Sequence, residues 1–307
     1  MRNLSLDYLK VLLSFFVVFL HTGFLYDFSS EIGYLFVNGI FRVAVPIFFI
    51  INGYYFYDIR DKFFLFKWMK RVFILYFVWT IIYLPVIIFN SNFFKIIENF
   101  LIGYFILWYL VALLIAGVSL FLLRKVSNKF LLTLAFLLFI AGYLIQSLGN
   151  AHIYSGQIDD LLNWVPASRN FLFFALPFMV IGFIIRKIDF KIKFRYNLGF
   201  FILLLMVLLS ESYVNYILTS EPVDLLLSLF FLCPFVFILF NNFIFMGKSK
   251  NIANFSTGIF LIHPYIIFFI KFIYEVSNTY LSILTIILSC LVSVFLVKLN
   301  EKIKILL

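Results

Sequence analysis

Apolar runs long enough to cross a lipid bilayer recur along the whole chain, and this feature constrains the fold more than any other. Of the 307 residues, 65% are hydrophobic and 12% are charged, a balance that soluble domains do not have. A segment of this length inside hydrocarbon must satisfy its own backbone groups, so it must be a helix. The sequence therefore predicts an all-α, polytopic integral membrane bundle in a cell membrane, with one domain over residues 1–307.

Hydropathy predicts about ten membrane-spanning helices. The expected spans are residues 6–26, 34–57, 72–90, 99–123, 130–148, 169–186, 197–213, 223–242, 255–274 and 280–298.

Most of the 24 Lys and Arg residues fall on one side of this arrangement. That side collects Arg2, Lys10, Arg60, Lys62, Lys67, Lys70, Arg71, Arg124, Lys125, Lys129, Arg186, Lys187, Lys191, Lys193, Arg195, Lys248, Lys250, Lys298, Lys302 and Lys304. Basic loops stay in the cytoplasm, so both termini are predicted to be cytoplasmic. The net charge of +10 is then a sign of topology, and it does not indicate binding to nucleic acid.

Three basic side chains, Lys10, His21 and Arg42, lie inside the first two apolar runs. Such groups are costly in hydrocarbon and mark functional sites unless they have a partner. Lys10 and His21 are eleven residues apart, so a helix over residues 6–26 places them on one face, separated by roughly 16 Å along its axis. Pro46 is expected to kink the second helix and to free the carbonyl group of Arg42.

The order of these residues resembles the membrane acyltransferase 3 family. The pattern is a basic residue, ten residues and His21, then Arg42, Pro46, Phe48, Phe49 and Gly53. Lys10 stands where arginine is usual. Further resemblance lies in LWYL (Leu107 to Leu110), RNFLFFALPFMVIGF (Arg169 to Phe183) and STGIFLIHP (Ser256 to Pro264), in which Phe260 replaces the usual tyrosine.

The resemblance implies an O-acyltransferase that modifies cell-surface polysaccharides. It would take an acyl group, in the first instance acetyl, from cytoplasmic acyl-CoA and transfer it to a hydroxyl of a glycan or lipid-linked sugar. An imidazole can act as general base or as transient acyl carrier, and both roles stay open for His21. Arg42 would stabilise the developing oxyanion or bind a phosphate or carboxylate. The apolar spans offer few acids, which argues against a buried ion pair for Arg42.

The remaining candidates would hold the substrates. The donor phosphates are expected at a basic cytoplasmic mouth, although topology and anionic lipids would explain the same charges. This acyl-CoA-binding set is Lys10, Lys67, Lys70 and Arg71. The acceptor or the lining of its path is assigned to Asn52, Trp108, Tyr109, Arg169 and His263. Core packing for the aromatic residues, an interfacial anchor for Arg169 and packing for His263 are the alternatives.

No group of His, Cys, Asp and Glu has the spacing of metal ligands, so no metal is expected. Two other classes of function are the alternatives. A transporter or flippase of a lipid-linked glycan or of acyl groups would also explain intramembrane charges, but it predicts repeated halves with interrupted helices, which the sequence does not show. A glycan polymerase would need a larger basic outer loop than residues 149–168 provide.

Overall fold

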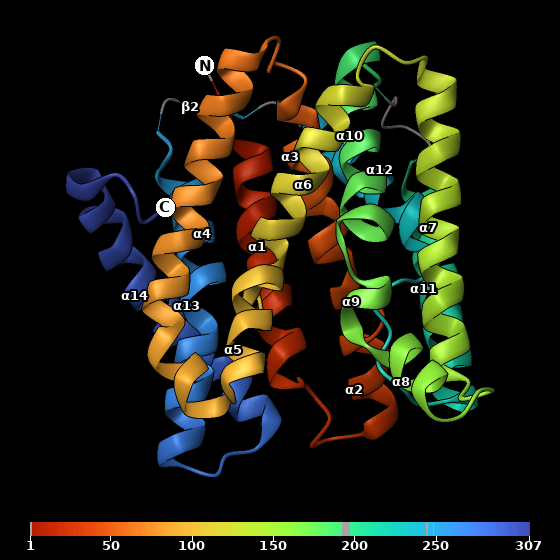
Figure 1. The fold of residues 1–307 in the computed structure, drawn as a ribbon, viewed down its shortest axis with the longest axis vertical. Coiled ribbons are helices and arrows are strands. Elements are labelled where there is room, and N and C mark those ends of the chain that lie inside the picture. Colours follow the sequence, from red (N-terminus) through yellow and green to blue (C-terminus); the bar gives the residue numbers. More distant parts are fainter. Residues whose placement is uncertain (1, 192–196, 244, 248) are drawn as a thin grey trace.

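The structure is a computed structural model that describes residues 2–191, 197–243, 245–247 and 249–307. Of the basic residues used to predict the topology, Lys193, Arg195 and Lys248 lie outside these ranges. The described chain is helical almost throughout (Figure 1). The one sheet pairs β1 (Arg2–Asn3) antiparallel with β2 (Met246–Gly247), and so ties the first residues to the stretch before α13 (Asn251–Ile273).

The other elements follow in chain order. They are α1 (Leu4–Thr22), α2 (Ser30–Val37), the 3-10 helix η1 (Ile40–Val43), α3 (Ala44–Phe56), α4 (Lys62–Asn90), α5 (Phe93–Glu98), the π-helix η2 (Asn99–Gly103), α6 (Trp108–Leu123), α7 (Asn128–Asn150), α8 (Gln157–Asn163), α9 (Val165–Ser168), the π-helix η3 (Phe171–Ala175), α10 (Leu176–Ile188), α11 (Asn197–Leu218), α12 (Leu229–Asn242) and α14 (Asn278–Ile303).

Among the described residues, 8 helical segments are long and apolar enough to cross a membrane. The pair formed by Phe93–Gly103 and Trp108–Leu123 bends by 47° and adds a broken span, and α12 is a shorter apolar helix. Each of the predicted ranges falls on one of these segments. The prediction of an all-α polytopic membrane bundle is therefore confirmed. The number of crossings and the side of the termini stay predictions.

Capping residues move several boundaries away from those that hydropathy suggests. The first helix ends at Thr22 because Gly23 adopts the left-handed conformation (φ 71°) that stops a helix, so its predicted extension to residue 26 is wrong. The third span starts at Lys62, well before residue 72, because the Asp61 side chain accepts a hydrogen bond from the backbone N–H of Phe64 and caps the helix.

The expected kink at Pro46 is also wrong. The break in the second span lies earlier, at η1, which follows Gly39. Helix α3 begins at Ala44, so Pro46 sits in its first turn, where the backbone N–H groups have no partner within the helix. Arg42 therefore projects from a short 3-10 turn between two helices.

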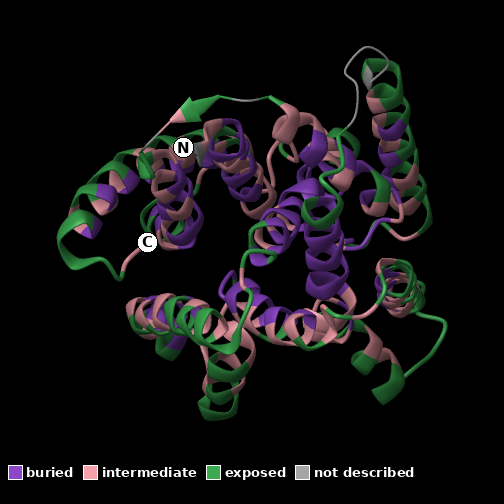
Figure 2. Ribbon diagram, turned by 90° about the horizontal axis from the view of Figure 1, so that it is seen from above, coloured by how far each residue is buried: buried purple, intermediate pink, exposed green. Residues whose placement is uncertain are grey.

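The bundle buries its second span most deeply. In the most apolar window of Ser30–Phe56, 78% of residues are buried, against 11% for Leu198–Leu218, so α3 is central and α11 faces outward. Figure 2 shows buried residues gathered on the inner helices and exposed residues on the outer ones. Glycines let α3 and α10 approach closely: a Cβ at Gly53 would meet the Met179 carbonyl, and one at Gly182 would meet the Ile50 carbonyl.

Loops rich in Lys and Arg gather at one end of the bundle, which we call the basic end. It is uppermost in Figure 1 and includes β1, β2, the connections α3–α4 and α6–α7 and the C-terminal end of α10. The opposite end holds α2, α8 and the α13–α14 connection. Helix α1 starts at the basic end, so it carries Lys10 near that end and His21 in its last turn near the other.

Candidate active site

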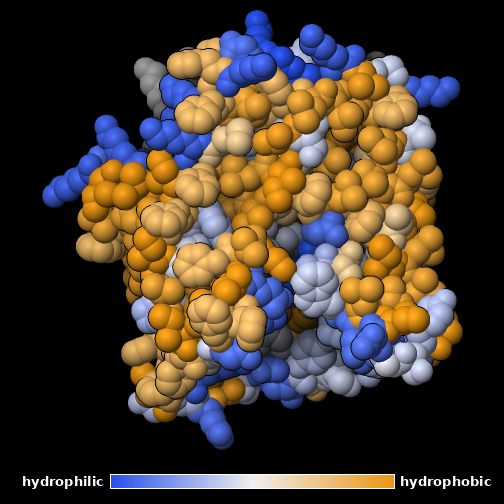
Figure 3. Space-filling model, viewed as in Figure 1, coloured by the Kyte–Doolittle hydropathy of each residue, from blue (hydrophilic) through white to orange (hydrophobic). Residues whose placement is uncertain are grey.

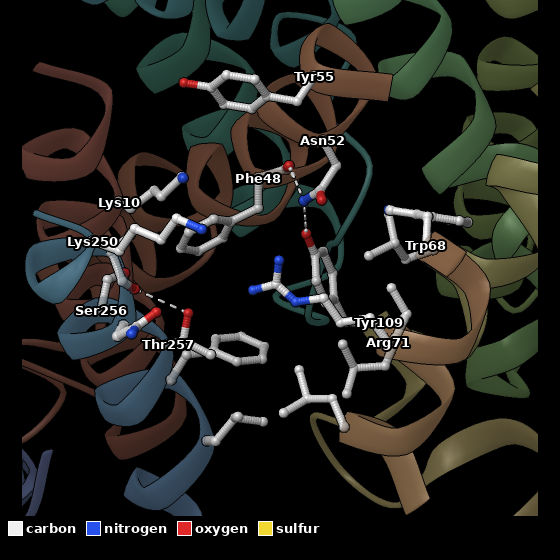
Figure 4. Close-up of a pocket in the computed structure, with 18 residues that line it drawn as sticks. Lys10, Phe48, Asn52, Tyr55, Trp68, Arg71, Tyr109, Lys250, Ser256 and Thr257 are labelled. Atoms are coloured by element: carbon white, nitrogen blue, oxygen red, sulfur yellow. Dashed lines mark hydrogen bonds between the residues drawn. The ribbon is translucent and has the colours of Figure 1, made fainter. Parts of the chain in front are cut away.

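A cavity of about 420 Å³ opens between α1, α3, α4, α6 and α13 (Figure 4). Lys10 of α1, Arg71 of α4 and Lys250, the residue before α13, direct their charged ends into it. Lys10 also forms an ion pair with Asp7, at 3.4 Å. The structure thus brings together two of the predicted acyl-CoA ligands and adds a third cation. Three cations at the rim of a cavity suit a ligand that carries several phosphates.

The wall of this cavity is polar where α3 meets α6. The Asn52 amide donates hydrogen bonds to the Tyr109 hydroxyl at 2.8 Å and to the Phe48 carbonyl at 2.9 Å. This pair of bonds fixes the amide and turns both residues toward the cavity. Asn52 and Tyr109 were predicted as acceptor-site or path-lining residues, and both line the cavity.

Aromatic rings connect the cavity to a pair of histidines. Phe48, Tyr109 and Phe260 all line the cavity and pack against one another, with ring centroids 5.6 to 6.3 Å apart. The Phe260 ring in turn lies 6.2 Å from the ring of His263. His263 stacks on His21, with centroids 5.5 Å apart and an interplanar angle of 21°. Neither histidine lines the cavity itself.

His263 is held in a defined state by α13. It is completely buried, and its Nδ1 lies 3.3 Å from the carbonyl oxygen of Ile259. A carbonyl can only accept, so Nδ1 carries the hydrogen and the Nε2 of the neutral ring keeps a lone pair. That Nε2 is buried without a hydrogen-bond partner among the described residues. His21 is more accessible than His263 and contacts the Phe105 ring, with centroids 4.5 Å apart.

Arg42 belongs to a second polar cluster, formed with Arg169 and Asp224. One Nη of Arg42 donates to a carboxylate oxygen of Asp224 and the other donates to Asn38 Oδ1 at 2.7 Å. Arg169 follows α9 and donates from Nη1 to the second oxygen of Asp224 at 3.3 Å. The expectation that Arg42 lacks an acidic partner is therefore wrong. The two arginines lie within electrostatic range of His21.

The backbone around Asp224 is fixed from α7. Gln146 Oε1 accepts hydrogen bonds from the backbone N–H groups of Asp224 at 2.7 Å and Leu225 at 2.9 Å. Asn38 Oδ1 accepts a further bond from the N–H of Val223 at 3.3 Å. The carboxylate is thus held in place before any ligand binds.

Other predicted residues lie elsewhere. Lys67 and Lys70 do not line this cavity, and both line a separate pocket of about 240 Å³ together with Arg71 and Lys304. Trp108 is not among the residues that line the cavity, and its ring lies under the Arg169 guanidinium, 5.0 Å from the centroid. In the described part of the chain, no group of three His, Cys, Asp or Glu residues could hold a metal ion.

Sequence reasoning missed Lys250, Asp224 and Gln146 as site residues. Lys250 was counted only toward the topology, and its place before α13 was the available signal. Asp224 stands at the start of an apolar run, where a carboxylate is costly unless it is paired. This position could have suggested a buried basic partner. Nothing in the sequence connects Gln146 to Asp224.

The family profile of an acyltransferase domain matches residues 3–298. A serine/alanine racemase of Enterococcus gallinarum is 27% identical over 87% of this chain and 41% of its own length. Two amino-acid racemases of Enterococcus faecalis are 26% identical over 58% of the chain and 22% identical over 99%, with 27% and 47% of their own lengths covered. The chain thus spans less than half of these relatives.

No solved structure matches the chain. The family profile covers nearly all of it, from β1 to the last third of α14, and includes the cavity, the histidine pair and the arginine cluster. This multi-pass membrane protein therefore belongs to the acyltransferase 3 family.

Proposed function

We propose that the protein is a membrane-bound O-acetyltransferase of the plasma (inner) membrane. It takes the acyl group from cytoplasmic acetyl-CoA and transfers it to a sugar hydroxyl of a cell-surface or lipid-linked polysaccharide. The observation that carries this proposal is the chain of contacts from the basic cavity through Phe260 to His263 and His21. A phosphate-binding mouth and a general base are the two parts that acyl transfer from a coenzyme A thioester requires.

The donor is assigned to the cavity at the basic end. Lys10, Arg71 and Lys250 would bind the phosphates of the coenzyme, and the Asn52 and Tyr109 wall would face its amide-containing arm. Coenzyme A occurs in the cytoplasm, and the positive-inside rule places the basic end on that side. The second pocket, with Lys67 and Lys70, lies beside the first and shares Arg71 with it.

His21 is assigned as the general base because it is the more accessible of the two histidines. Its imidazole takes the proton of the acceptor hydroxyl while the hydroxyl oxygen attacks the thioester carbonyl carbon. The C–S bond breaks, and the thiolate leaves and takes up the proton. The buried His263 ring acts as a positioning residue, since it stacks on His21 and fixes its plane. Transfer through an acyl-imidazole on His21 would use the same geometry.

The decisive test uses purified protein in lipid vesicles with acetyl-CoA and a cell-surface glycan. The wild type should release free thiol and acetylate the glycan, as followed by mass spectrometry. His21→Ala should lose activity by about 10²- to 10⁴-fold while inserting stably. The matched control is His152→Ala, which removes an exposed histidine paired with Asp159 near α8 and should change nothing. Full activity of His21→Ala would remove this residue from the mechanism.

Transport is the second candidate function, and interrupted helices favour it. The second span is broken at η1 and a further span is bent by 47° between η2 and α6, as in transporters whose broken helices line a central site. Movement of a glycan or of acyl groups across the vesicle membrane, at a rate that acetyl-CoA does not change, would support this function over acyl transfer.

The racemase names of the relatives are not extended to this chain. They describe proteins more than twice as long as the part it matches, so the name cannot be assigned to the shared region. We propose that the shared region performs the acyltransferase-type function in the membrane.

A further inference from the structure

We propose that Arg42 and Arg169 form a subsite for an oxyanion, a carboxylate or a phosphate, carried by the acceptor. The inference rests on the proposed function for the identity of the ligand as acceptor, but the binding site itself follows from the arginine cluster. It defines the acceptor class as acidic: a uronic-type sugar or a sugar phosphate.

The arginine cluster has more positive than negative charge. Two guanidinium groups share the single carboxylate of Asp224, and in the described residues no other acid is paired with either arginine. One positive charge is therefore left without a counter-charge inside an apolar bundle, where unmatched charge is unfavourable. A bound anion would supply the missing charge.

The cluster also contains hydrogen-bond donors without an acceptor. The Nε atoms of Arg42 and Arg169 are both buried and neither has a hydrogen-bond partner in the described structure. Arg42 is 9% exposed, with its two Nη atoms already occupied by Asp224 and Asn38. Buried donors are nearly always satisfied, so two orphaned N–H groups in one cluster indicate a ligand with acceptor oxygens. Guanidinium groups bind carboxylates and phosphates in this way.

A ligand can reach the cluster. The side chains of Arg169 and Asp224 are 24% and 25% exposed although both belong to the interior cluster. Figure 3, in the view of Figure 1, shows hydrophilic side chains inside a hollow in the lower half of the molecule, between α5 and α9. Arg169 directly follows α9, and its guanidinium lies over the Trp108 ring, 5.0 Å from the ring centroid. This contact and the bond to Asp224 hold a side chain that is still 24% exposed.

The position of the cluster suits an acceptor and not the donor. Lys10, Arg71 and Lys250 surround the cavity near the basic end, whereas Arg42 and Arg169 lie within electrostatic range of His21 at the far end of α1. An acidic sugar held by the arginines would therefore lie on the His21 side of the bundle, away from the basic end. An anchored charge close to the reacting group orients the acceptor and lowers its entropy loss on reaction.

The test measures binding directly and needs no acyl transfer. The full chain in detergent is titrated with galacturonate, galactose 6-phosphate and galactose, which differ at C6 only, and binding is followed by calorimetry. Galacturonate or galactose 6-phosphate should bind and galactose should bind roughly ten- to hundredfold more weakly, the range expected for hydrogen bonds to a charged group. Which of the two acidic sugars binds better identifies the oxyanion as carboxylate or phosphate.

Variants separate the subsite from general attraction of anions. Arg169→Gln should abolish the preference for the acidic sugar, and Arg169→Lys, which keeps the charge but loses the planar fork, should weaken it. Lys271→Gln removes an exposed cation from the same end of the bundle and should keep the preference. Equal binding of galactose and the acidic sugars by the wild type overturns the proposal, as does an equal loss of preference in Arg169→Gln and Lys271→Gln. Anion binding without thioester cleavage would reject the acetyltransferase function and retain the subsite.

Discussion

Replacing Asp224 by asparagine tests the electrostatics of the arginine cluster most directly. The substitution keeps the shape of the side chain, and Gln146 still holds the backbone N–H groups of residues 224 and 225. What changes is charge: Arg42 and Arg169 both lose their carboxylate partner. The protein should therefore lose stability without losing its local fold.

The magnitude follows from the burial of each pair. Arg42 is 9% exposed, and breaking a buried ion pair by removing one partner costs about 3–5 kcal/mol. The Arg169 pair is longer, at 3.3 Å, and more exposed, so it contributes about 0–1 kcal/mol. The free energy of unfolding of Asp224→Asn should fall by roughly 3–5 kcal/mol.

Equilibrium unfolding in mixed micelles measures this loss, and a double-mutant cycle tests its cause. Arg42→Gln combined with Asp224→Asn removes both charges, so the double variant should be more stable than the sum of the two single losses implies, by roughly 1–3 kcal/mol. Asp159→Asn, which breaks an exposed pair with His152, is the control and should cost about 0–1 kcal/mol. A strictly additive cycle, or an Asp224→Asn protein as stable as the control, would refute the reasoning.

Three further predictions concern other parts of the molecule. Lys250→Gln should raise the KM for acetyl-CoA about tenfold with kcat little changed, because it removes one phosphate contact and no reacting group; a fall in kcat alone would contradict this. Gly182→Ala should cost about 1–3 kcal/mol in the same unfolding assay, since its Cβ would meet a carbonyl of α3, whereas Gly199→Ala meets nothing within 4 Å and should be neutral. Hydrogen bonds from Thr279 lower the pKa of Asp27, so the stability they add is complete above the unfolded pKa of about 3.9 and is lost as pH falls through the lower folded pKa. The stability difference between wild type and Asp27→Asn should accordingly be constant near neutral pH and vanish only in acid.

The fold class and the positions of the spans could be predicted from the sequence because both depend on local properties. Apolar length predicts the helix bounds closely where the capping residue adjoins the apolar run, as the segment Asn128–Asn150, capped by Ser127, shows against its predicted range 130–148. Charge asymmetry likewise predicts the basic end. The errors come from single residues: Gly23 ends α1 early, and Asp61 starts α4 early.

The site could be predicted only in part, because it depends on contacts between residues that are far apart in the sequence. Lys10 and Arg71 share a cavity as expected, since both belong to the basic end. The partner of Arg42, however, lies 182 residues away in the loop before α12, and hydropathy carries no information about such pairing. The break in the second span is predicted at Pro46, but it lies earlier, at the 3-10 turn Ile40–Val43 that carries Arg42.

The glycine contact between α3 and α10 has a consequence for how a donor enters. Because backbone lies against backbone at Gly53 and Gly182, these two helices cannot slide or separate without breaking contacts along both. They therefore behave as one rigid pair of helices. Asn52, next to Gly53, belongs to this rigid pair of helices and would keep its position when the proposed donor binds. Widening of the entrance is therefore expected from α1, α4, α6 or α13, which line the rest of the cavity, and labels placed on those helices, not on α3, should report binding of the proposed donor.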